Sequence, residues 1–178
     1  MLGKWKDIEV KEVLKATVFR YFQKRRQNAD GTKEFTFDVL QCPNWVNVVA
    51  TDTDGHFVMV KQFRHGTAEF SFEFPAGVIH SGEDPMLAGM RELREETGMT
   101  SNQWTYLGEM NVNPAFMTNK CYFYHAKNCI KTHDQELDPL EEIEVHAMSA
   151  KTLHTAIQNH SVNHSLVTCG LYLLEHHS

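Results

Sequence analysis

The order of predicted elements indicates an α+β fold with a mixed β-sheet. Alternating apolar and polar residues fill the chain up to residue 75, one capped helical segment follows, and strands return before two C-terminal helices. This order differs from the repeated strand-helix units of a doubly wound parallel sheet. The chain has 178 residues, 42% of them hydrophobic, which is enough for one substantial core. We expect a domain over residues 41–178 and a β-rich arm over residues 1–40.

The first half of the chain is predicted to consist mainly of strands. Residues 13–27 alternate between apolar and polar side chains, and residues 35–66 contain three further strand-like segments. Asp54 and Gly55 occupy the position of a tight hairpin between two of these segments. Pro75 ends the last strand, because proline cannot donate a ladder hydrogen bond. Aromatic residues in these strands are predicted to pack in the core: Phe35, Phe37 and Trp45.

A helix is predicted directly after this strand region. It begins near Glu83-Asp84-Pro85, since proline is favoured in a first turn, continues through residues 87–97 and stops at Gly98. The later elements follow in the order of strands at 104–110, 120–128 and 143–149, then helices at 149–160, with Ser149 as the N-cap, and at 165–177.

Composition excludes several classes of protein. The net charge of −6, from 17 basic and 23 acidic residues, disfavours a broad nucleic-acid surface, which needs clustered Lys and Arg. The four cysteines show no CxxC spacing, so we expect reduced thiols and a cytoplasmic location. The start of the chain has no apolar signal region, and no apolar run approaches the roughly 20 residues of a membrane span. The eleven histidines are scattered and predict no metal cluster of their own.

Three glutamates share one face of the predicted helix. At about 100° per residue, Glu92, Glu95 and Glu96 fall within an arc of roughly 100°, while Leu93 lies on a separate apolar arc that suits the core. Like charges at these spacings repel. One interpretation is a solvated acidic face that neighbouring arginines neutralise. The sharper interpretation is a metal site, because the face follows a Gly-rich loop and carboxylate oxygens are the ligands of Mg²⁺.

The segment that carries these glutamates resembles the Nudix box of the Nudix hydrolases. Gly77, Glu83 after five residues, and RELREETGM at 91–99 after seven more agree with that motif at every specified position. The resemblance implies an α/β/α sandwich around a mixed sheet. It also implies a pyrophosphohydrolase that uses Mg²⁺ or Mn²⁺ to cleave a nucleoside diphosphate linked to another group.

The resemblance assigns roles to individual residues. It implies that Glu92, Glu95, Glu96 and the carbonyl of Ala76 bind metal, and that Gly77, Glu83, Arg91 and Gly98 are structural, with an ion pair between Glu83 and Arg91. A general base is also needed. The acidic segment QELDPLEEIEV resembles a late loop that supplies the base in related enzymes, so the catalytic candidates are Glu141 first, then Glu142 and Asp138, together with Glu95. An exposed acidic turn is the alternative for this loop.

Further segments resemble the ADP-ribose pyrophosphatase and nucleoside diphosphate sugar hydrolase subfamily. FEFPAG at 72–77 is similar to the approach to the box in that subfamily, and KQFR at 61–64 is similar to one of its strand ends. Arg64 is therefore expected to clamp a phosphate, a role that suits its fork of donors, although an exposed strand-end arginine is the alternative. Glu73 is expected to bind substrate or to support a residue that does.

The loop after the box departs from the subfamily pattern. NPAF at 113–116 lacks the usual glycine and carries a bulkier residue, which leaves room for ADP-ribose, GDP-mannose, UDP-glucose or similar substrates. Asn113 and Phe116 are expected to bind the sugar or base, with Asn119 nearby, unless the loop is purely structural. The resemblance implies a homodimer in which the N-terminal arm packs on the partner. Two other functions stay open: a pyrophosphohydrolase of RNA 5′ ends or dinucleoside polyphosphates, and a non-catalytic nucleotide-sensing module.

Overall fold

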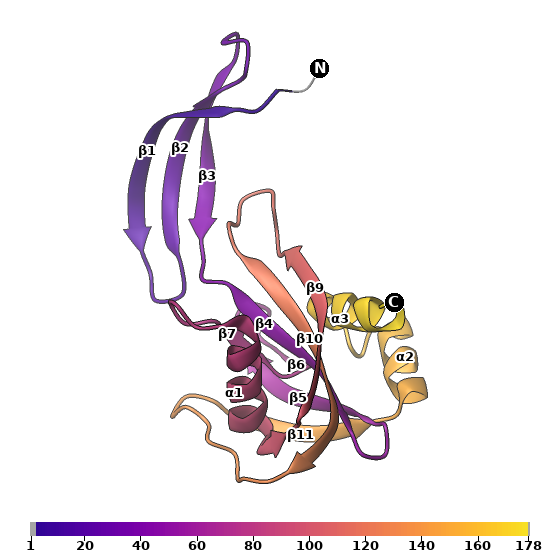
Figure 1. Ribbon diagram of the computed structural model, residues 1–178. Coiled ribbons are helices and arrows are strands. Elements are labelled where there is room, and N and C mark those ends of the chain that lie inside the picture. Colours follow the sequence, from indigo (N-terminus) through magenta and orange to yellow (C-terminus); the bar gives the residue numbers. More distant parts are fainter. Residues whose placement is uncertain (1–2, 178) are drawn as a thin grey trace. The chain divides into compact units, whose positions relative to one another are not determined.

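The computed structural model describes residues 3–177, which form two compact units (Figure 1). The first unit comprises the described chain up to Asn44 together with Met110–Lys120. The second comprises Trp45–Glu109 and the described chain from Cys121 onward. All four cysteines are free thiols, and no helix among residues 3–177 is long and apolar enough to cross a membrane.

The first unit is built on a three-stranded antiparallel sheet in the order β1-β2-β3. The extended segment predicted at 13–27 is divided between two strands, because the amide of Ala16 donates to the carbonyl of Phe19 and closes a turn. Opposite charges pair diagonally across the strands, as in Arg25–Glu34 at 2.7 Å, which favours this register. The strands are β1 (Lys6–Lys15), β2 (Arg20–Gln27) and β3 (Glu34–Gln41).

The prediction that Phe35 packs in the core is wrong. Its side chain is 65% exposed, and those of Phe37 and Trp45 are half-buried. The rings of Phe35 and Phe37 instead lie edge to face, with centroids 5.4 Å apart. The described residues of the first unit contain no helix that could cover a sheet face, so an aromatic residue there contacts other aromatic rings and solvent.

A second, mixed sheet of eight strands carries the rest of the fold. Its central strands follow the order β11-β5-β4-β10-β8, with β6 beside β5, β7 beside β4, and β9 beside β10. β4 and β10 run parallel, whereas the pairs β8–β10, β11–β5, β4–β5, β4–β7 and β5–β6 are antiparallel, which confirms the predicted mixed sheet. The strands are β4 (Trp45–Asp52), β5 (Phe57–Arg64), β6 (Glu69–Glu73), β7 (Ala76–Val78), β8 (Met99–Thr100), β9 (Gln103–Asn111), β10 (Lys120–Lys131) and β11 (Ile143–Met148).

Helices cover both faces of this sheet (Figure 1). Alternate residues of a strand point to opposite faces, and in β4 Val46 and Val48 lie against Gly89 of α1, whereas Asn47 and Val49 lie against Gly170 of α3. The predicted α/β/α sandwich is therefore confirmed. The helices are α1 (Pro85–Thr97), α2 (Ala150–Gln158) and α3 (Ser165–Glu175).

The sheet opens into a fork that positions the candidate site. β4 pairs with β5 only at Ala50 and Thr51, after which the two strands diverge. β6 continues along β5, and β7 continues along β4. The chain from Glu73 to Ala76 crosses between them, where the carbonyl of Pro75 accepts from the amide of Val48 at 2.8 Å. Pro75 thus ends β6, as predicted, at the point where the chain changes partner strands.

Both ends of α1 follow from the local sequence. Asp84 is the N-cap, and its carboxylate accepts from the amides of Met86 at 2.9 Å and Leu87 at 3.2 Å. Gly98 adopts a left-handed conformation with φ of 69° and ends the helix. The carbonyl of Gly98 then accepts from the amides of Thr132 and His133, each at 3.0 Å. The predicted helix boundaries are confirmed.

Two glycines with the same backbone conformation provide a stability test. Gly98 and Gly55 have φ of 69° and 79°, so Gly→Ala strains both, at about 1 kcal/mol each. A Cβ on Gly98 would also collide with the backbone carbonyl of His133, whereas the space around Gly55 is open. We expect Gly98→Ala to lower the unfolding free energy in urea by about 1–3 kcal/mol more than Gly55→Ala does. Equal losses would contradict this account of the C-cap.

Candidate active site

The three glutamates of the acidic helix face differ in their surroundings. The Glu96 side chain is 4% exposed, and its Oε2 accepts from the amide of Ala76 at 3.0 Å. Glu92 is largely buried beside β7. Glu95 is the most exposed of the three and lies 3.1 Å from Arg91. The helix therefore directs two carboxylates into the fork of the sheet and leaves the third at its edge.

Burial changes the proton affinities of Glu92 and Glu96. Desolvation raises the pKa of Glu96 well above its ordinary value, and the neighbouring charge of Glu92 raises it further. Desolvation also raises the pKa of Glu92, against the opposing effect of Arg91. Two buried carboxylates of like charge favour the bound proton unless a cation lies between them. The acidic face is thus not the solvated surface that the sequence left open.

Gly77 leaves room for the carboxylate of Glu92 and does not need the backbone freedom of glycine. A Cβ at this position would fall on the carboxylate of Glu92, far inside van der Waals contact. Glycine therefore leaves the space that the Glu92 carboxylate occupies, and a larger residue would push this side chain aside. The resemblance implies a structural role for Gly77, and this contact with Glu92 offers a physical reason for it.

Arg91 connects the loop before the helix to the carboxylates on it. Its Nε and Nη2 donate to the two oxygens of Glu83 at 2.9 and 3.1 Å, and Nη2 also donates to the carbonyl of Val78 at 3.0 Å. Its Nη1 donates to Glu92 at 2.8 Å and to Glu95 at 3.1 Å. Hydrogen bonds from Arg91 lower the pKa of Glu83 to about 2. The expected ion pair between Glu83 and Arg91 is present, and it extends into the acidic face.

Arg64 and Glu73 form a bidentate ion pair beside the fork. Arg64 donates from Nε to Oε1 of Glu73 at 2.7 Å and from Nη2 to Oε2 at 2.5 Å. Glu73 is 2% exposed. Although burial acts to raise the pKa of Glu73, the hydrogen bonds from Arg64 hold it below the ordinary value. The charges of Glu96 and Glu141 also raise the pKa of Arg64, after the larger effect of Glu73, which puts this guanidinium in the electrostatic field of the acidic cluster.

The late acidic loop is anchored to the end of α1. The amide of Glu136 donates to the carbonyl of Glu95 at 2.9 Å. The side-chain amide of Gln135 donates to the carbonyl of Glu96 at 2.6 Å and to that of Ile143 at 3.2 Å. Helix ends leave carbonyls without intrahelical donors, and this loop supplies donors to two of them. Sequence patterns predict no role for Gln135, because a long-range hydrogen bond to backbone carbonyls leaves no local pattern.

Glu141 is the candidate base whose charge reaches the buried carboxylates. Its charge is among the causes that raise the pKa values of Glu92 and Glu96. Its side chain is exposed and accepts from the amide of Asp138 at 3.1 Å, which folds the loop back on itself. Glu142 is also exposed and directly precedes β11. The structure brings Glu141 into the same electrostatic field as Glu92, Glu96 and Arg64.

The sequence profile of the NUDIX domain matches residues 43–167. The chain belongs to the Nudix family. An ADP-ribose pyrophosphatase of Bacillus subtilis is 33% identical over 109 residues, which cover 61% of this chain and 59% of that protein. The methanol dehydrogenase activator of Bacillus methanolicus is 32% identical over 121 residues, with coverages of 68% and 64%. The chain thus spans about three fifths of the length of these curated relatives.

A solved structure shares the fold of this Nudix chain. The crystal structure of an ADP compounds hydrolase matches with a TM-score of 0.86 over 98% of this chain and 94% of the other, at 20% sequence identity. Identity at this level shows the fold alone. The α/β/α sandwich and the N-terminal antiparallel sheet thus both have a counterpart in a known structure.

The donor set of the Nudix helix fits a divalent cation. Nudix proteins generally use divalent metals. Glu96 and Glu92 carry buried carboxylate oxygens, and hard cations such as Mg²⁺ prefer such oxygens. A bound cation would offset the burial and mutual repulsion of the two negative charges, which are the causes of their raised pKa values. The amide of Ala76 already donates to Glu96, so its carbonyl lies on the same peptide segment as a candidate ligand.

The loop expected to contact the sugar or base belongs to the first unit. Asn113 begins a turn, in which its carbonyl accepts from the amide of Met117 at 2.8 Å. The carbonyl of Phe116 accepts from the amide of Leu40 in β3 at 2.7 Å. Phe116 is 42% exposed. Asn119 is 1% exposed, and neither polar atom of its side chain has a hydrogen-bond partner within residues 3–177. Contact of these residues with substrate remains a prediction.

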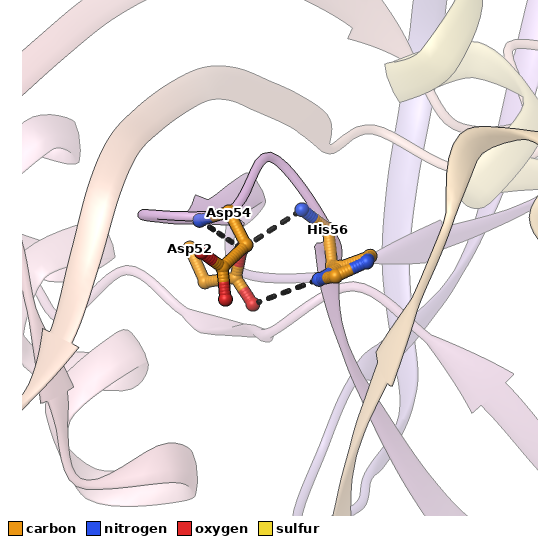
Figure 2. A group of neighbouring side chains, drawn as sticks. All are labelled: Asp52, Asp54 and His56. Carbon is orange, nitrogen blue, oxygen red and sulfur yellow. Dashed lines mark hydrogen bonds and ion pairs between the residues drawn. The ribbon is translucent and has the colours of Figure 1, made fainter.

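A second group of possible metal-binding side chains lies at the β4–β5 hairpin (Figure 2). Asp52, Asp54 and His56 have ligand atoms within 4.8 Å of one another. The hairpin accounts for this proximity, because one oxygen of Asp52 accepts from the amides of Asp54 at 3.0 Å and His56 at 2.8 Å. His56 Nδ1 lies 3.5 Å from the other oxygen. The group stabilises the tight turn that the sequence predicts at Asp54-Gly55.

The raised pKa of Glu96 predicts how stability changes with pH. The folded protein holds this proton more tightly than the unfolded chain, whose pKa is near 4.5, so metal-free protein loses stability as pH rises above that value. Gln at position 96 keeps an acceptor for the Ala76 amide and removes the buried charge. At pH 7 without metal, we expect Glu96→Gln to raise the unfolding free energy, and each kcal/mol of that increase raises Tm by roughly 2–4 °C.

The measurement is thermal unfolding of wild type and variant in the presence of chelator. It has two controls, one at pH 4 and one with Mg²⁺. At pH 4 the advantage of Glu96→Gln is expected to shrink, since the wild-type carboxyl is then protonated in both states. Mg²⁺ is expected to stabilise the wild type more than the variant, because ligands stabilise the state that binds them. A variant that is less stable than metal-free wild type at pH 7 would contradict the assignment of Glu96 as a charge buried for a cation.

Proposed function

We propose that this Nudix protein hydrolyses the diphosphate bond of nucleoside diphosphate sugars, ADP-ribose among them, to a nucleoside monophosphate and a sugar phosphate. The observation that carries the proposal is the bidentate pairing of Arg64 with buried Glu73 in the field of the acidic helix. A guanidinium fixed in this way keeps donors that suit phosphate oxygens. A relative whose name is ADP-ribose pyrophosphatase supports the substrate class.

The residues of the site are proposed to have separate roles. Glu92, Glu95, Glu96 and the Ala76 carbonyl would hold Mg²⁺ or Mn²⁺. A divalent cation bound there would neutralise diphosphate oxygens and lower the pKa of a bound water. Arg64 would bind a phosphate, and Glu73 would hold the guanidinium of Arg64 in place. Glu141 would accept the proton of the attacking water, with Glu142 as the second candidate.

Glu141 is the preferred base for two reasons. It lies in an exposed loop, where a carboxylate can turn toward a bound substrate, and its charge already acts on Glu92 and Glu96. The bonds from Gln135 and Glu136 fix one end of this loop to α1 while the segment around Glu141 stays at the surface. A base on an anchored but exposed loop can reach a proton near the helix without joining the buried charge cluster.

A substrate panel tests the function. Phosphate release, coupled through a phosphomonoesterase, is measured from ADP-ribose, GDP-mannose, UDP-glucose, ADP-glucose, diadenosine polyphosphate and 5′-triphosphorylated RNA, with Mg²⁺ and with chelator. We expect metal-dependent release from ADP-ribose and nucleotide sugars. Release confined to the polyphosphate or RNA would contradict the substrate class. Nucleotide binding without release from any of the six compounds would instead indicate a sensing module.

Variants of the late loop provide the matched controls for this panel. Glu141→Gln removes the proposed base and keeps the size of the side chain, so we expect kcat to fall by about 10²–10⁴-fold with little change in the Mg²⁺ dependence. Glu136→Gln alters a charged residue of the same loop whose backbone bond to α1 is retained, and its kcat is expected to stay close to that of the wild type. Equal losses in both variants would indicate that loop structure, and not proton transfer, is affected.

We further propose that the protein is a homodimer joined through its N-terminal sheet. Apolar side chains on β1 and β3 are unusually exposed, as in Val10 at 51%, Leu14 at 53% and Phe35 at 65%. Exposed apolar patches favour association. We also propose residues 1–40 as the dimerisation arm and residues 41–178 as the Nudix domain. The free thiols are consistent with the cytoplasm as the proposed location.

The mass in solution tests the dimer. Light scattering after size exclusion is expected to give twice the 20.5 kDa chain mass for the wild type. Phe35→Lys places a charge on the exposed apolar surface and is expected to give the monomer mass with an unchanged circular dichroism spectrum. A monomeric wild type, or a variant that stays dimeric, would contradict an interface at this sheet.

A further inference from the structure

A histidine outside the Nudix box lies beside the buried carboxylate of Glu73. His164 is the N-cap residue of α3, and its Nε2 is 3.8 Å from Oε2 of Glu73. The side chain of His164 is 29% exposed and that of Glu73 only 2%. Sequence patterns predict no role for His164, since this residue lies far from the box and belongs to no motif. The fold brings the start of α3 to the fork where β6 ends.

The helix cap fixes which nitrogen of His164 carries the proton. Nδ1 accepts from the amide of Leu166 at 3.3 Å, so this nitrogen has no proton of its own. In a neutral imidazole the proton then resides on Nε2, the atom that faces Glu73. Burial lowers the pKa of His164 and the charge of Arg64 lowers it further, which favours the neutral ring despite the opposing charge of Glu73.

Glu73 is therefore held from two directions. Both of its oxygens accept from Arg64, and the N–H of His164 approaches Oε2 from α3. A separation of 3.8 Å is longer than a hydrogen bond, so the contact is an electrostatic attraction that a small shift of either side chain converts into one. Because Glu73 is almost fully buried, it has few other positions to adopt. His164 is one of the groups that confine Glu73, so loss of this imidazole would give the carboxylate room to shift relative to Arg64.

We propose that His164 is a positioning residue that holds Glu73, and through it the guanidinium of Arg64, in the orientation that binds the substrate diphosphate. The inference rests on the proposed function for the role of Arg64. The competing explanation is that His164 only caps α3. The two explanations differ in what an asparagine at this position would do, because asparagine is a good N-cap but has no group that reaches like the imidazole Nε2–H.

Three variants separate the explanations. His164→Ala removes both the cap and the Nε2–H, His164→Asn restores the cap alone, and His154→Asn is the matched control. His154 is also a histidine paired with a carboxylate, Glu175 at 2.8 Å, but it lies on α2 and has no part in the proposed site. The measurements are Tm, kcat and KM on the substrate that the wild type cleaves best.

The expected result is a split between stability and substrate affinity. His164→Asn is expected to regain the Tm that His164→Ala loses, whereas both are expected to raise KM by about 3- to 10-fold with kcat within about twofold, since binding common to ground and transition states is lost. His154→Asn is expected to keep the wild-type KM. A wild-type KM in His164→Asn would overturn the proposal and leave the capping role alone.

A double-mutant cycle tests whether His164 acts through Glu73. Glu73→Gln is expected to raise KM, and the addition of His164→Asn to it is expected to change KM by less than about twofold, because residues that act through one partner are not additive. Two effects that multiply in full would overturn the proposed route through Glu73.

A measurement without substrate separates this inference from the proposed function. The ¹⁵N shifts of labelled imidazoles are expected to show a protonated Nε2 and an unprotonated Nδ1 at His164, and Glu73→Gln is expected to lower the pKa of this ring because it removes a neighbouring negative charge. The opposite tautomer would overturn the inference even if the enzyme cleaves nucleotide sugars. A wild type that cleaves none of the panel, with the expected tautomer present, would overturn the proposed function instead.

Discussion

The burial of Glu96 is the constraint on which the rest of the site depends. Its carboxylate lies in the fork between β4 and β5 and accepts from the Ala76 amide. One hydrogen bond thus joins α1 to the start of β7. The same burial places it against Glu92 and raises the pKa of both. A folded chain with this arrangement is under electrostatic strain in the absence of a counter-charge. The strain is located where a cation is useful.

Several features of the molecule serve to make that burial possible. Gly77 removes a side chain that would displace Glu92. Gly98 ends α1 so that its last carbonyls meet the loop that begins with Thr132. The loop in turn ties Gln135 to the carbonyl of Glu96. These contacts are structural in the ordinary sense, yet each determines the position of a charged group in the site.

Local sequence patterns predict the elements of this fold better than the contacts between them. The caps at Asp84 and Gly98 and the turn at Asp54-Gly55 involve short separations along the chain, and the structure contains each of them. The ion pair of Glu83 with Arg91, which the family resemblance implied, is also present. The residues that sequence reasoning missed, such as Gln135 and His164, act across the fold. The short strands β7 and β8 were missed as well, because two or three residues carry no periodic pattern.

Exposure was predicted poorly for a related reason. A β-branched or aromatic strand residue packs in a core only where another layer covers it, and periodicity does not reveal whether that layer exists. Phe35 lies in a sheet whose unit has no helix among its described residues, whereas Phe123 of β10, in the covered sheet, is fully buried. The same chemistry thus gives a core residue in one unit and an exposed residue in the other. For the acidic helix face the sequence left a solvated surface open beside the preferred metal site, and the burial of Glu96 and Glu92 does not fit a solvated surface.

Arg91 shows why structural and chemical roles do not separate in this site. Its guanidinium divides its donors, with Nε and Nη2 directed to Glu83 and Nη1 directed to Glu92 and Glu95. A lysine has one ammonium group and could not serve both sets with fixed geometry. Arg91 therefore braces the loop before α1 and also neutralises part of the acidic face without entering it. The remaining negative charge, concentrated on buried Glu96 and its neighbour, is what a divalent cation would balance.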